Sequence, residues 1–301
     1  MQHAYLIIAH NDFSILEKSI LLLDDVHNDF YIHIDKKVKN FDFNYFKNLV
    51  KKSNVYFVKR INVCWGSFSQ IACEYLLLKA AYKKHYDYYH LISGADMPIA
   101  SNDIIYNFFK TNNGKEFVAF DNHDKINDDV LARIKYYHFF VPFAKSKNRL
   151  LRNVFNFFHY YFIRIENILN INRTKNCLFK FRKGANWVSI TDRFASYVIK
   201  QEKIIKKYFK YSYCADELFI QTILYNSDFY KNVYSNNNDD YLGIKRCIDW
   251  SRGNPYTFKM EDFDYLVTSN CFWARKFSTK IDDKIIDEIY NYVKEKNDGK
   301  S

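Results

Sequence analysis

Short apolar runs alternate with helical patterns over about the first 125 residues of this 301-residue chain, and this alternation restricts the fold more than any other feature. The runs expected to form strands are residues 4–9, 30–34, 55–58, 88–92 and 116–120. Strands that alternate with helices at this spacing are typical of βα units, whose strands form a largely parallel sheet. We therefore predict an α/β fold with a mostly parallel central sheet flanked by helices.

The second half of the chain is more helical and less regular. We expect a strand at 185–190, helices at 192–208 and 216–225, and a final helix from Ile281. With only 7 Gly and 3 Pro in the chain, a flexible linker between separate domains is not expected. The prediction is one domain over residues 1–301, with a first half of about 1–125 and a second half of about 126–301.

Polar residues follow several of the predicted strands. His10, Asp35, the stretch Gly94-Ala95-Asp96 and Asp121 all stand at strand ends. In open α/β sheets, ligands bind beyond the carboxyl ends of the strands. These residues are therefore expected to line a binding site at one edge of the sheet.

A net charge of +11 calls for an anionic partner, and the charge is concentrated between Lys145 and Lys183. That stretch holds ten Lys or Arg and one acid, Glu166. Its basic residues are interleaved with the aromatic residues Phe155, Phe157, Phe158, Tyr160, Tyr161 and Phe162. Three interpretations stay open: a solvated helix that packs its aromatic rings inward, a helix that lies on an anionic membrane, or a nucleic-acid contact. No nucleic-acid-binding motif accompanies the charge, so nucleic acid is not expected as a partner.

The chain begins MQHAYLIIAH, which lacks the basic start of a signal peptide. No apolar run approaches the length needed to span a bilayer, and we expect a cytoplasmic protein. The six cysteines form no CxxC pair, so reduced thiols are expected, with Cys73 and Cys271 in the core. The nine histidines show no zinc-ligand spacing.

Two acidic motifs could carry chemistry. Asp216 and Glu217 open an apolar helical segment, where they could cap the helix through its dipole or supply a general base. The literal DxD motif, Asp262-Phe263-Asp264, lies inside a helical stretch and is interpreted as a solvated helix face rather than a metal site. Asp121-Asn122-His123-Asp124 stands at a better position but lacks the DxD spacing.

Adjacent cations stand at Arg275 and Lys276, within the segment WARKF. Along a strand their side chains point to opposite faces, so only one can face a given site. A second cation could come from Arg252 or Arg246. The alternative is a pair of basic residues that simply flanks an edge strand.

Six motifs in register resemble one family. They are FYIHIDKK (30–37), NVYFV with VCWGSFSQIACEYLLLKAA (54–81), YYHLISGADMPIAS (88–101), GANWVSIT (184–191), ADELFIQTIL (215–224) and CIDWSRGNPYTFKMEDFDYLVTSNCFWARKF (247–277). In this order they resemble the core-2/I-branching β-1,6-N-acetylglucosaminyltransferases and the related peptide O-xylosyltransferases, in a bacterial form. The animal members carry a membrane anchor and luminal disulfides, which this sequence does not suggest.

The resemblance implies a GT-A-like nucleotide-sugar-binding fold, with a nucleotide-binding first half and an acceptor-binding, catalytic second half. It implies inverting transfer from a UDP-sugar to a glycan hydroxyl without a metal or other cofactor. N-acetylglucosamine is the favoured sugar, although Ala274-Arg275 resembles the xylosyltransferase version. Xylose, glucose and galactose stay open, as does a catalytically inactive glycan- or nucleotide-binding module.

The resemblance also implies roles for individual residues. Glu217 matches the catalytic base, preceded by the acid Asp216, and Lys276 with Arg252 or Arg275 matches the cations on the donor diphosphate. The expected nucleoside and donor side consists of His10, His33, Asp35, Trp65 and Ser67. The expected sugar pocket consists of Gly94, Asp96, Trp187, Asp249 and Trp250. A bacterial setting suggests surface polysaccharide assembly, with a glycan or lipid-linked oligosaccharide acceptor at the inner face of the cytoplasmic membrane.

Overall fold

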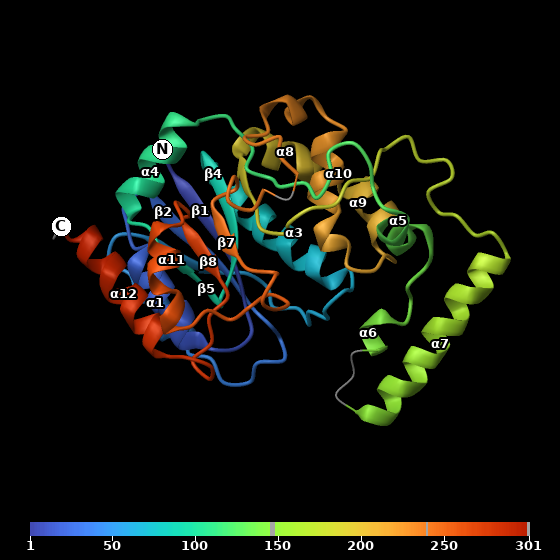
Figure 1. Ribbon diagram of the computed structural model, residues 1–301, viewed down its shortest axis with the longest axis horizontal. Helices are drawn as coiled ribbons and strands as arrows, with labels where there is room; N and C mark the ends of the chain where they lie inside the picture. Colours follow the sequence, from blue (N-terminus) through green and yellow to red (C-terminus); the bar gives the residue numbers. More distant parts are fainter. Residues whose placement is uncertain (145–147, 239, 300–301) are drawn as a thin grey trace.

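The computed structural model describes residues 1–144, 148–238 and 240–299 of the chain. A central sheet is sandwiched between helices, and a long helical arm projects from one side of this body (Figure 1). The sheet has the strand order β3-β2-β1-β4-β6. Its strands are β1 (His3–Ala9), β2 (Asn28–Ile34), β3 (Asn54–Phe57), β4 (Tyr88–Ser93) and β6 (Ser189–Thr191).

The first four strands of this sheet are mutually parallel, and β6 is antiparallel to β4. The predicted α/β class with a mostly parallel central sheet is thus confirmed. A second sheet, which the sequence did not predict, has the order β5-β8-β7. Its strands are β5 (Asp96–Pro98), β7 (Arg246–Ile248) and β8 (Trp273–Arg275).

Helices cover both faces of the central sheet (Figure 1). Those before the sheet closes with β6 are α1 (Phe13–Leu22), α2 (Phe43–Lys47), α3 (Ser69–Tyr82), α4 (Asn102–Thr111), α5 (Asp128–Lys135), α6 (Val141–Ala144) and α7 (Arg149–Ile168). Those after it are α8 (Asp192–Lys200), α9 (Glu202–Phe209), α10 (Phe219–Tyr225), α11 (Phe263–Thr268) and α12 (Lys284–Asn297). Three short 3-10 helices are η1 (Ala215–Glu217), η2 (Asp228–Asn232) and η3 (Met260–Asp262).

Strand β1 shows why the sheet is buried on both sides. Ala4 and Leu6 join a core shared with α3, α8, α9 and α10, whereas Tyr5 and Ile7 join a core shared with α1 and α4. Successive side chains of a strand point to opposite faces, so a strand covered on both faces must be apolar throughout. A third core packs α12 against α1 and the second sheet.

One predicted strand is wrong. Residues 116–120 are buried but form only isolated bridges, from Glu116 to Val233, Phe117 to Ser189 and Phe120 to Asn238. An apolar run of this length predicts burial, and here burial is reached without a continuous ladder. The helix expected at 192–208 is divided into α8 and α9, and of the strand expected at 185–190 only β6 forms. Other differences are shifts of boundary, such as a final helix that starts at Lys284 rather than Ile281.

The basic, aromatic segment forms the projecting arm, made of α6 and α7 (Figure 1). Its rings do not pack inward as one interpretation proposed. Within 155–162, Phe155 and Phe162 are half-buried, but Phe157, Phe158, Tyr160 and Tyr161 are exposed. Among the described residues, no helix is both long and apolar enough to cross a membrane.

Candidate active site

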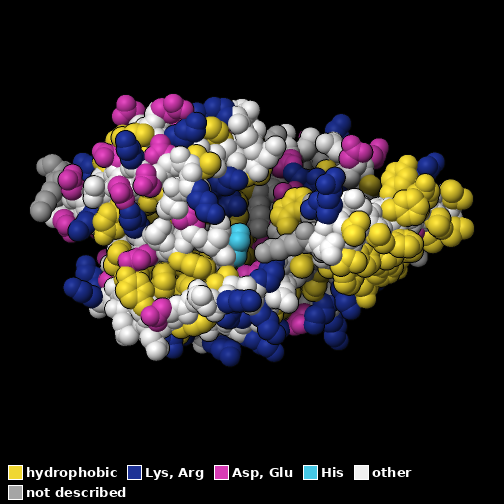
Figure 2. Space-filling model, turned by 90° about the horizontal axis from the view of Figure 1, so that it is seen from below, with side chains coloured by type: hydrophobic (Ala, Val, Ile, Leu, Met, Phe, Trp, Pro, Cys, Tyr) yellow, Lys and Arg dark blue, Asp and Glu magenta, His cyan; other side chains and the backbone are white. Residues whose placement is uncertain are grey.

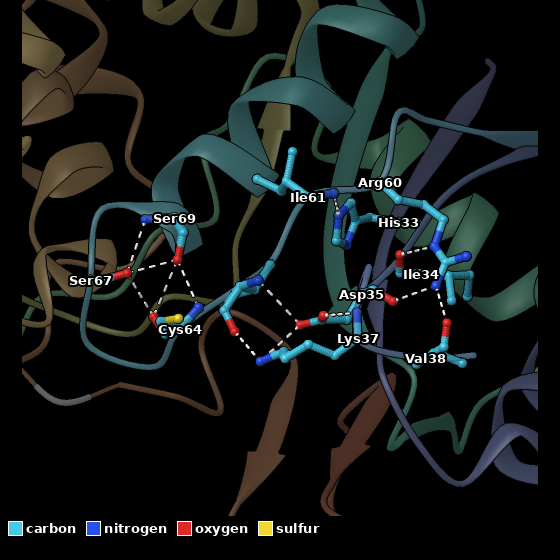
Figure 3. Close-up of polar contacts among 11 residues, drawn as sticks. His33, Ile34, Asp35, Lys37, Val38, Arg60, Ile61, Cys64, Ser67 and Ser69 are labelled. Carbon is cyan, nitrogen blue, oxygen red and sulfur yellow. Dashed lines mark hydrogen bonds and ion pairs between the residues drawn. The ribbon is translucent and has the colours of Figure 1, made fainter. Parts of the chain in front are cut away.

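Asp35 follows β2 at the carboxyl edge of the central sheet, as predicted, and is buried there. Its Oδ1 accepts a hydrogen bond from the Lys37 backbone N–H at 2.8 Å, and its Oδ2 accepts one from the Val63 backbone N–H at 3.2 Å (Figure 3). The Lys37 ammonium also lies 3.3 Å from Oδ2. The carboxylate therefore ties the end of β2 to the chain that leads into α3.

Residues Arg60 and Ile61 make further contacts with the end of β2 beside Asp35. The ring of His33 is fully buried, and its Nε2 accepts a hydrogen bond from the Ile61 backbone N–H at 3.0 Å (Figure 3). Burial lowers the pKa of His33, so the neutral, accepting form is favoured. The Arg60 guanidinium donates to the carbonyl oxygens of Ile34 and Asp35 at 3.1 and 2.8 Å. His33 thus fixes the chain at Ile61 beside this edge of the sheet, and its ring is not exposed there.

A tight loop before α3 carries Trp65 and Ser67. Ser67 Oγ donates to the Cys64 carbonyl at 2.9 Å and lies 2.7 Å from Ser69 Oγ (Figure 3). Gly66 has φ +75°, and a Cβ there would lie 2.7 Å from the Tyr213 ring. The Gly66 carbonyl accepts from the Cys214 backbone N–H at 2.9 Å. This loop is therefore docked on the segment that leads into Glu217, with the Trp65 indole exposed beside it.

Glu217 lies at the end of η1, and its side chain is 33% exposed. Its Oε2 accepts a hydrogen bond from Arg133 Nη1 at 3.0 Å and lies 3.7 Å from Lys183 Nζ. Lys183 also pairs with Asp121, the residue predicted at the sheet edge. Among the described residues, Glu217 Oε1 has no hydrogen-bond partner, so one oxygen is held while the other is open to a ligand.

Asp216 points the other way, into the protein. Its Oδ2 accepts from Gln70 Nε2 on α3 at 2.8 Å. Burial, followed by the charge of Glu217, raises the pKa of Asp216 to about 7. Beneath it, burial and the charge of Asp216 raise the pKa of Glu74, whose Oε1 accepts from Asn186 Nδ2 at 3.0 Å. Burial thus favours the neutral forms of these two inner carboxyls.

The segment 184–187 joins Glu217 to the second sheet. The Gly184 backbone N–H donates to the Glu217 carbonyl at 3.0 Å, and three residues later the Trp187 ring lies 4.3 Å from the Arg275 guanidinium. Three residues of extended chain span roughly 11 Å at most. Gly184 is required in this place, because a Cβ there would lie 1.9 Å from the Ala119 carbonyl oxygen.

Arg275 is bound at the junction of the two sheets. Its Nη1 donates to Asp96 Oδ1 at 2.7 Å and to the Ser93 hydroxyl. Asp96 is buried and also accepts from the Ser93 backbone N–H at 2.8 Å. Gly94 brings this turn against β1, since a Cβ there would lie 2.7 Å from that of Ala9. Asp96 and Gly94 therefore support Arg275 and the turn, with Asp96 turned away from solvent.

Lys276 and Arg252 differ in how their charges are used. Lys276 is half-buried, and no ion pair or hydrogen bond to its ammonium is found among the described residues. Arg252 is already paired twice, with Asp249 Oδ2 at 2.5 Å and with Asp262 Oδ1 at 2.7 Å. Of the predicted donor-site cations Arg252, Arg275 and Lys276, only Lys276 lacks a carboxylate partner in the described part of the chain.

These contacts correct the prediction for the DxD motif. Asp262 is a buried partner of Arg252 rather than part of a solvated face, and only Asp264 is exposed. Asp249, predicted in the sugar pocket, is bound by Arg252 as well, whereas its neighbour Trp250 is exposed. Across residues 1–144, 148–238 and 240–299, no three His, Cys, Asp or Glu side chains gather as metal ligands.

Two other basic residues of the prediction, Arg246 and His10, differ in burial. Arg246 is buried against Trp273 and donates to the Val188 carbonyl at 3.0 Å, so it supports the core and faces no site. His10 is exposed at the end of β1, within electrostatic reach of Asp35, Lys37 and Arg275.

The described cysteines all carry free thiols, and Cys73 and Cys271 are buried as predicted.

Around Asp216 and Glu217 the structure adds residues that were not predicted, among them Gln70, Glu74, Arg133 and Lys183. Arg133 and Lys183 lie in the stretch 122–183, where the family motifs are weakest. Gln70 and Glu74 stand four residues apart on one face of α3, which could have suggested a shared polar site.

With this geometry in place, comparison with known proteins identifies the family. The chain belongs to the Core-2/I-Branching enzyme family, whose model matches residues 3–269, and the resemblance inferred from the six motifs is confirmed. This is a family of glycosyltransferases.

Individual proteins similar to this chain are xylosyltransferases. Xylosyltransferase 2 of Rattus norvegicus is 23% identical over 94% of this chain, and Xylosyltransferase oxt of Drosophila pseudoobscura pseudoobscura is 23% identical over 88%. The chain spans about a third of the length of these relatives, 33% and 30% respectively. A crystal structure of mouse Xyloside xylosyltransferase 1 in its apo form aligns over 90% of this chain and 96% of its own, with 9% identity and a TM-score of 0.34. A TM-score this low does not establish a shared fold.

Proposed function

We propose that this protein is an inverting glycosyltransferase that moves a sugar from a UDP-sugar to a glycan hydroxyl and needs no metal ion. The observation that carries the proposal is Glu217: Arg133 holds one of its carboxylate oxygens, and the other has no partner in the described part of the chain. An open, oriented carboxylate suits a general base that takes the proton of an acceptor hydroxyl. The acceptor oxygen would then attack the anomeric carbon while UDP departs from the opposite face.

The departing diphosphate needs positive charge, which fixed cations can supply. Among the described residues the Lys276 ammonium has no partner, and Arg275 beside it is held over the Trp187 ring. Arg252 is the weaker candidate, because two carboxylates already neutralise it. The nucleoside is assigned to the edge formed by Asp35, His10 and the Trp65 loop.

The donor sugar rests on resemblance. The resemblance of the six motifs favours N-acetylglucosamine, and the names of the relatives favour xylose. UDP-N-acetylglucosamine and UDP-xylose are therefore the first donors to test, ahead of UDP-glucose and UDP-galactose. A glycan or lipid-linked oligosaccharide of a bacterial surface polysaccharide is the proposed acceptor class.

A thermal-shift panel of these UDP-sugars, each with EDTA or with manganese, tests the proposal. A ligand that binds only the folded protein at 100 times its Kd stabilises it by about 2.7 kcal/mol, which raises Tm. We expect the donor to raise Tm equally in EDTA and in manganese, and to be turned over in both. Loss of turnover in EDTA with recovery in manganese would refute the metal-free mechanism. Binding without turnover for any donor and glycan acceptor would favour the inactive binding module.

Removing the unpaired cation should weaken donor binding. For Lys276→Ala we expect the Kd for UDP to rise about 10- to 100-fold, because a hydrogen bond to a charged group is lost. Isothermal titration calorimetry with UDP measures this. Lys280→Ala, an exposed lysine four positions on, is the matched control and should leave the Kd unchanged. An unchanged Kd in Lys276→Ala would remove this lysine from the diphosphate site.

A further inference from the structure

The arm formed by α6 and α7 is fixed at its base and free along its length (Figure 1). At the base, the His138 backbone N–H donates to the Tyr211 carbonyl at 2.7 Å, and both oxygens of Glu166 accept from the Tyr137 backbone N–H, at 3.0 and 3.2 Å. Arg173 donates to the carbonyls of Tyr136 and Tyr208 at 3.1 and 3.0 Å. The arm therefore has a defined direction relative to the body rather than hanging from a loose linker.

One face of α7 is apolar and uncovered. Its members recur every three or four residues, the spacing of one helix face. They are Leu150 (76% exposed), Val154 (48%), Phe157 (57%), Tyr161 (47%), Ile165 (52%) and Ile168 (75%), with Leu151 and Phe158 alongside. We call these eight residues the apolar face. Figure 2 shows hydrophobic side chains gathered over the arm, at the far end from α12.

Outside the apolar face, the charged residues exposed on α7 are all basic. Arg149, Arg152 and Arg164 are exposed on α7. The one acid of the helix, Glu166, is buried and already bound by the Tyr137 backbone N–H. A second copy of the same helix would therefore bring three more arginines and no free carboxylate to meet them. Charge complementarity favours a negatively charged partner that is apolar beneath its surface.

We infer that the apolar face of α7 inserts into the interface of an anionic lipid bilayer, with the helix lying in the membrane plane. Aromatic and aliphatic side chains would enter the boundary between headgroups and acyl chains, and the three arginines would contact acidic headgroups. Each arginine near an anionic membrane surface strengthens binding roughly fivefold. The inference concerns binding alone and does not depend on the proposed transfer reaction.

The position of the arm gives this docking a consequence for the site. Arg133, which holds Glu217, lies on α5, a few residues before the base of the arm. The Arg133 carbonyl accepts from the Tyr213 backbone N–H at 2.9 Å, and Tyr213 packs against Trp65. A protein docked through α7 would thus hold its candidate active site close to the membrane surface, where a lipid-linked acceptor would be presented.

Co-sedimentation with liposomes tests the inference. We expect the protein to bind vesicles of phosphatidylcholine with 30% phosphatidylglycerol and to bind pure phosphatidylcholine far more weakly. Phe157→Glu with Tyr161→Glu should abolish binding, since both rings lie on the apolar face. Ile104→Glu with Tyr265→Glu changes two equally exposed apolar residues elsewhere and should bind like wild type. Equal loss in both double variants would overturn the assignment to α7.

A second pair of variants tests the charge. Replacing Arg149, Arg152 and Arg164 by Gln should lower the partition coefficient on the order of a hundredfold. The control replaces Lys284, Lys294 and Lys296, exposed on α12, by Gln and removes the same charge. Similar loss in both triple variants would mean that net charge acts and the arm does not. Absence of lipid binding, together with a dimer that Phe157→Glu with Tyr161→Glu dissociates, would instead assign the face to a second copy of the chain.

Discussion

Replacing Glu217 by glutamine should lower the turnover number for sugar transfer by roughly 10²- to 10⁴-fold, the usual contribution of a general base. The amide keeps the size of the side chain and can still accept a hydrogen bond from Arg133, but it cannot take a proton at neutral pH. Donor binding should persist, because Glu217 is proposed to act on the acceptor hydroxyl and not on the diphosphate. Single-turnover kinetics together with calorimetric titration of UDP would separate the two effects.

The chain offers a close control for this substitution. Glu202 is 35% exposed, and its carboxylate oxygens lie 2.6 Å from Lys79 and 2.6 Å from Lys206, so it resembles Glu217 in exposure and in having two cationic partners. Glu202→Gln should leave turnover unchanged. If Glu217→Gln retains wild-type turnover, another group must take the acceptor proton.

The central sheet could be predicted because its signal is local. Each buried parallel strand is a short apolar run, and the helices between such runs leave few other topologies. The second sheet had no such signal. Its strands are three residues long, and β8 reaches its antiparallel partner β5 from the far end of the sequence. The strand predicted at 116–120 was wrong although its apolar signal was clear. An apolar sequence predicts burial, but it does not specify the hydrogen-bond partner.

The candidate site divides in the same way. Asp35 and Glu217 stand at strand or helix ends that the sequence marks, so they could be proposed in advance. Arg133 could not, because its contact with Glu217 joins positions 84 residues apart. The pairing of Arg252 with Asp262 was missed as well, although the two are close in sequence, because a DxD pattern looks the same whether its first acid is solvated or buried.

The buried acids behind Glu217 should make the stability of the fold fall as pH rises. Asp216 has a pKa of about 7 in the folded protein, against an ordinary value of 3.8, because it is buried and lies beside the charge of Glu217. Between these values the unfolded chain releases a proton that the folded protein keeps. Through this group the free energy of unfolding therefore decreases by about 1.4 kcal/mol per pH unit from about pH 4 to about pH 7. Above about pH 7 this contribution no longer changes with pH.

Asp216→Asn removes this dependence while keeping an oxygen that can accept from Gln70. We expect the free energy of unfolding of the variant to rise relative to wild type over the same pH range, by up to about 4 kcal/mol at pH 7. Urea unfolding followed by circular dichroism measures this difference. Glu74→Gln should act in the same direction, because burial and the charge of Asp216 raise the pKa of Glu74 as well. Asp264→Asn, at an exposed acid, is the control and should follow the wild-type curve. A constant difference between Asp216→Asn and wild type from pH 4 to 8 would show that burial does not raise the pKa of Asp216 in the folded protein.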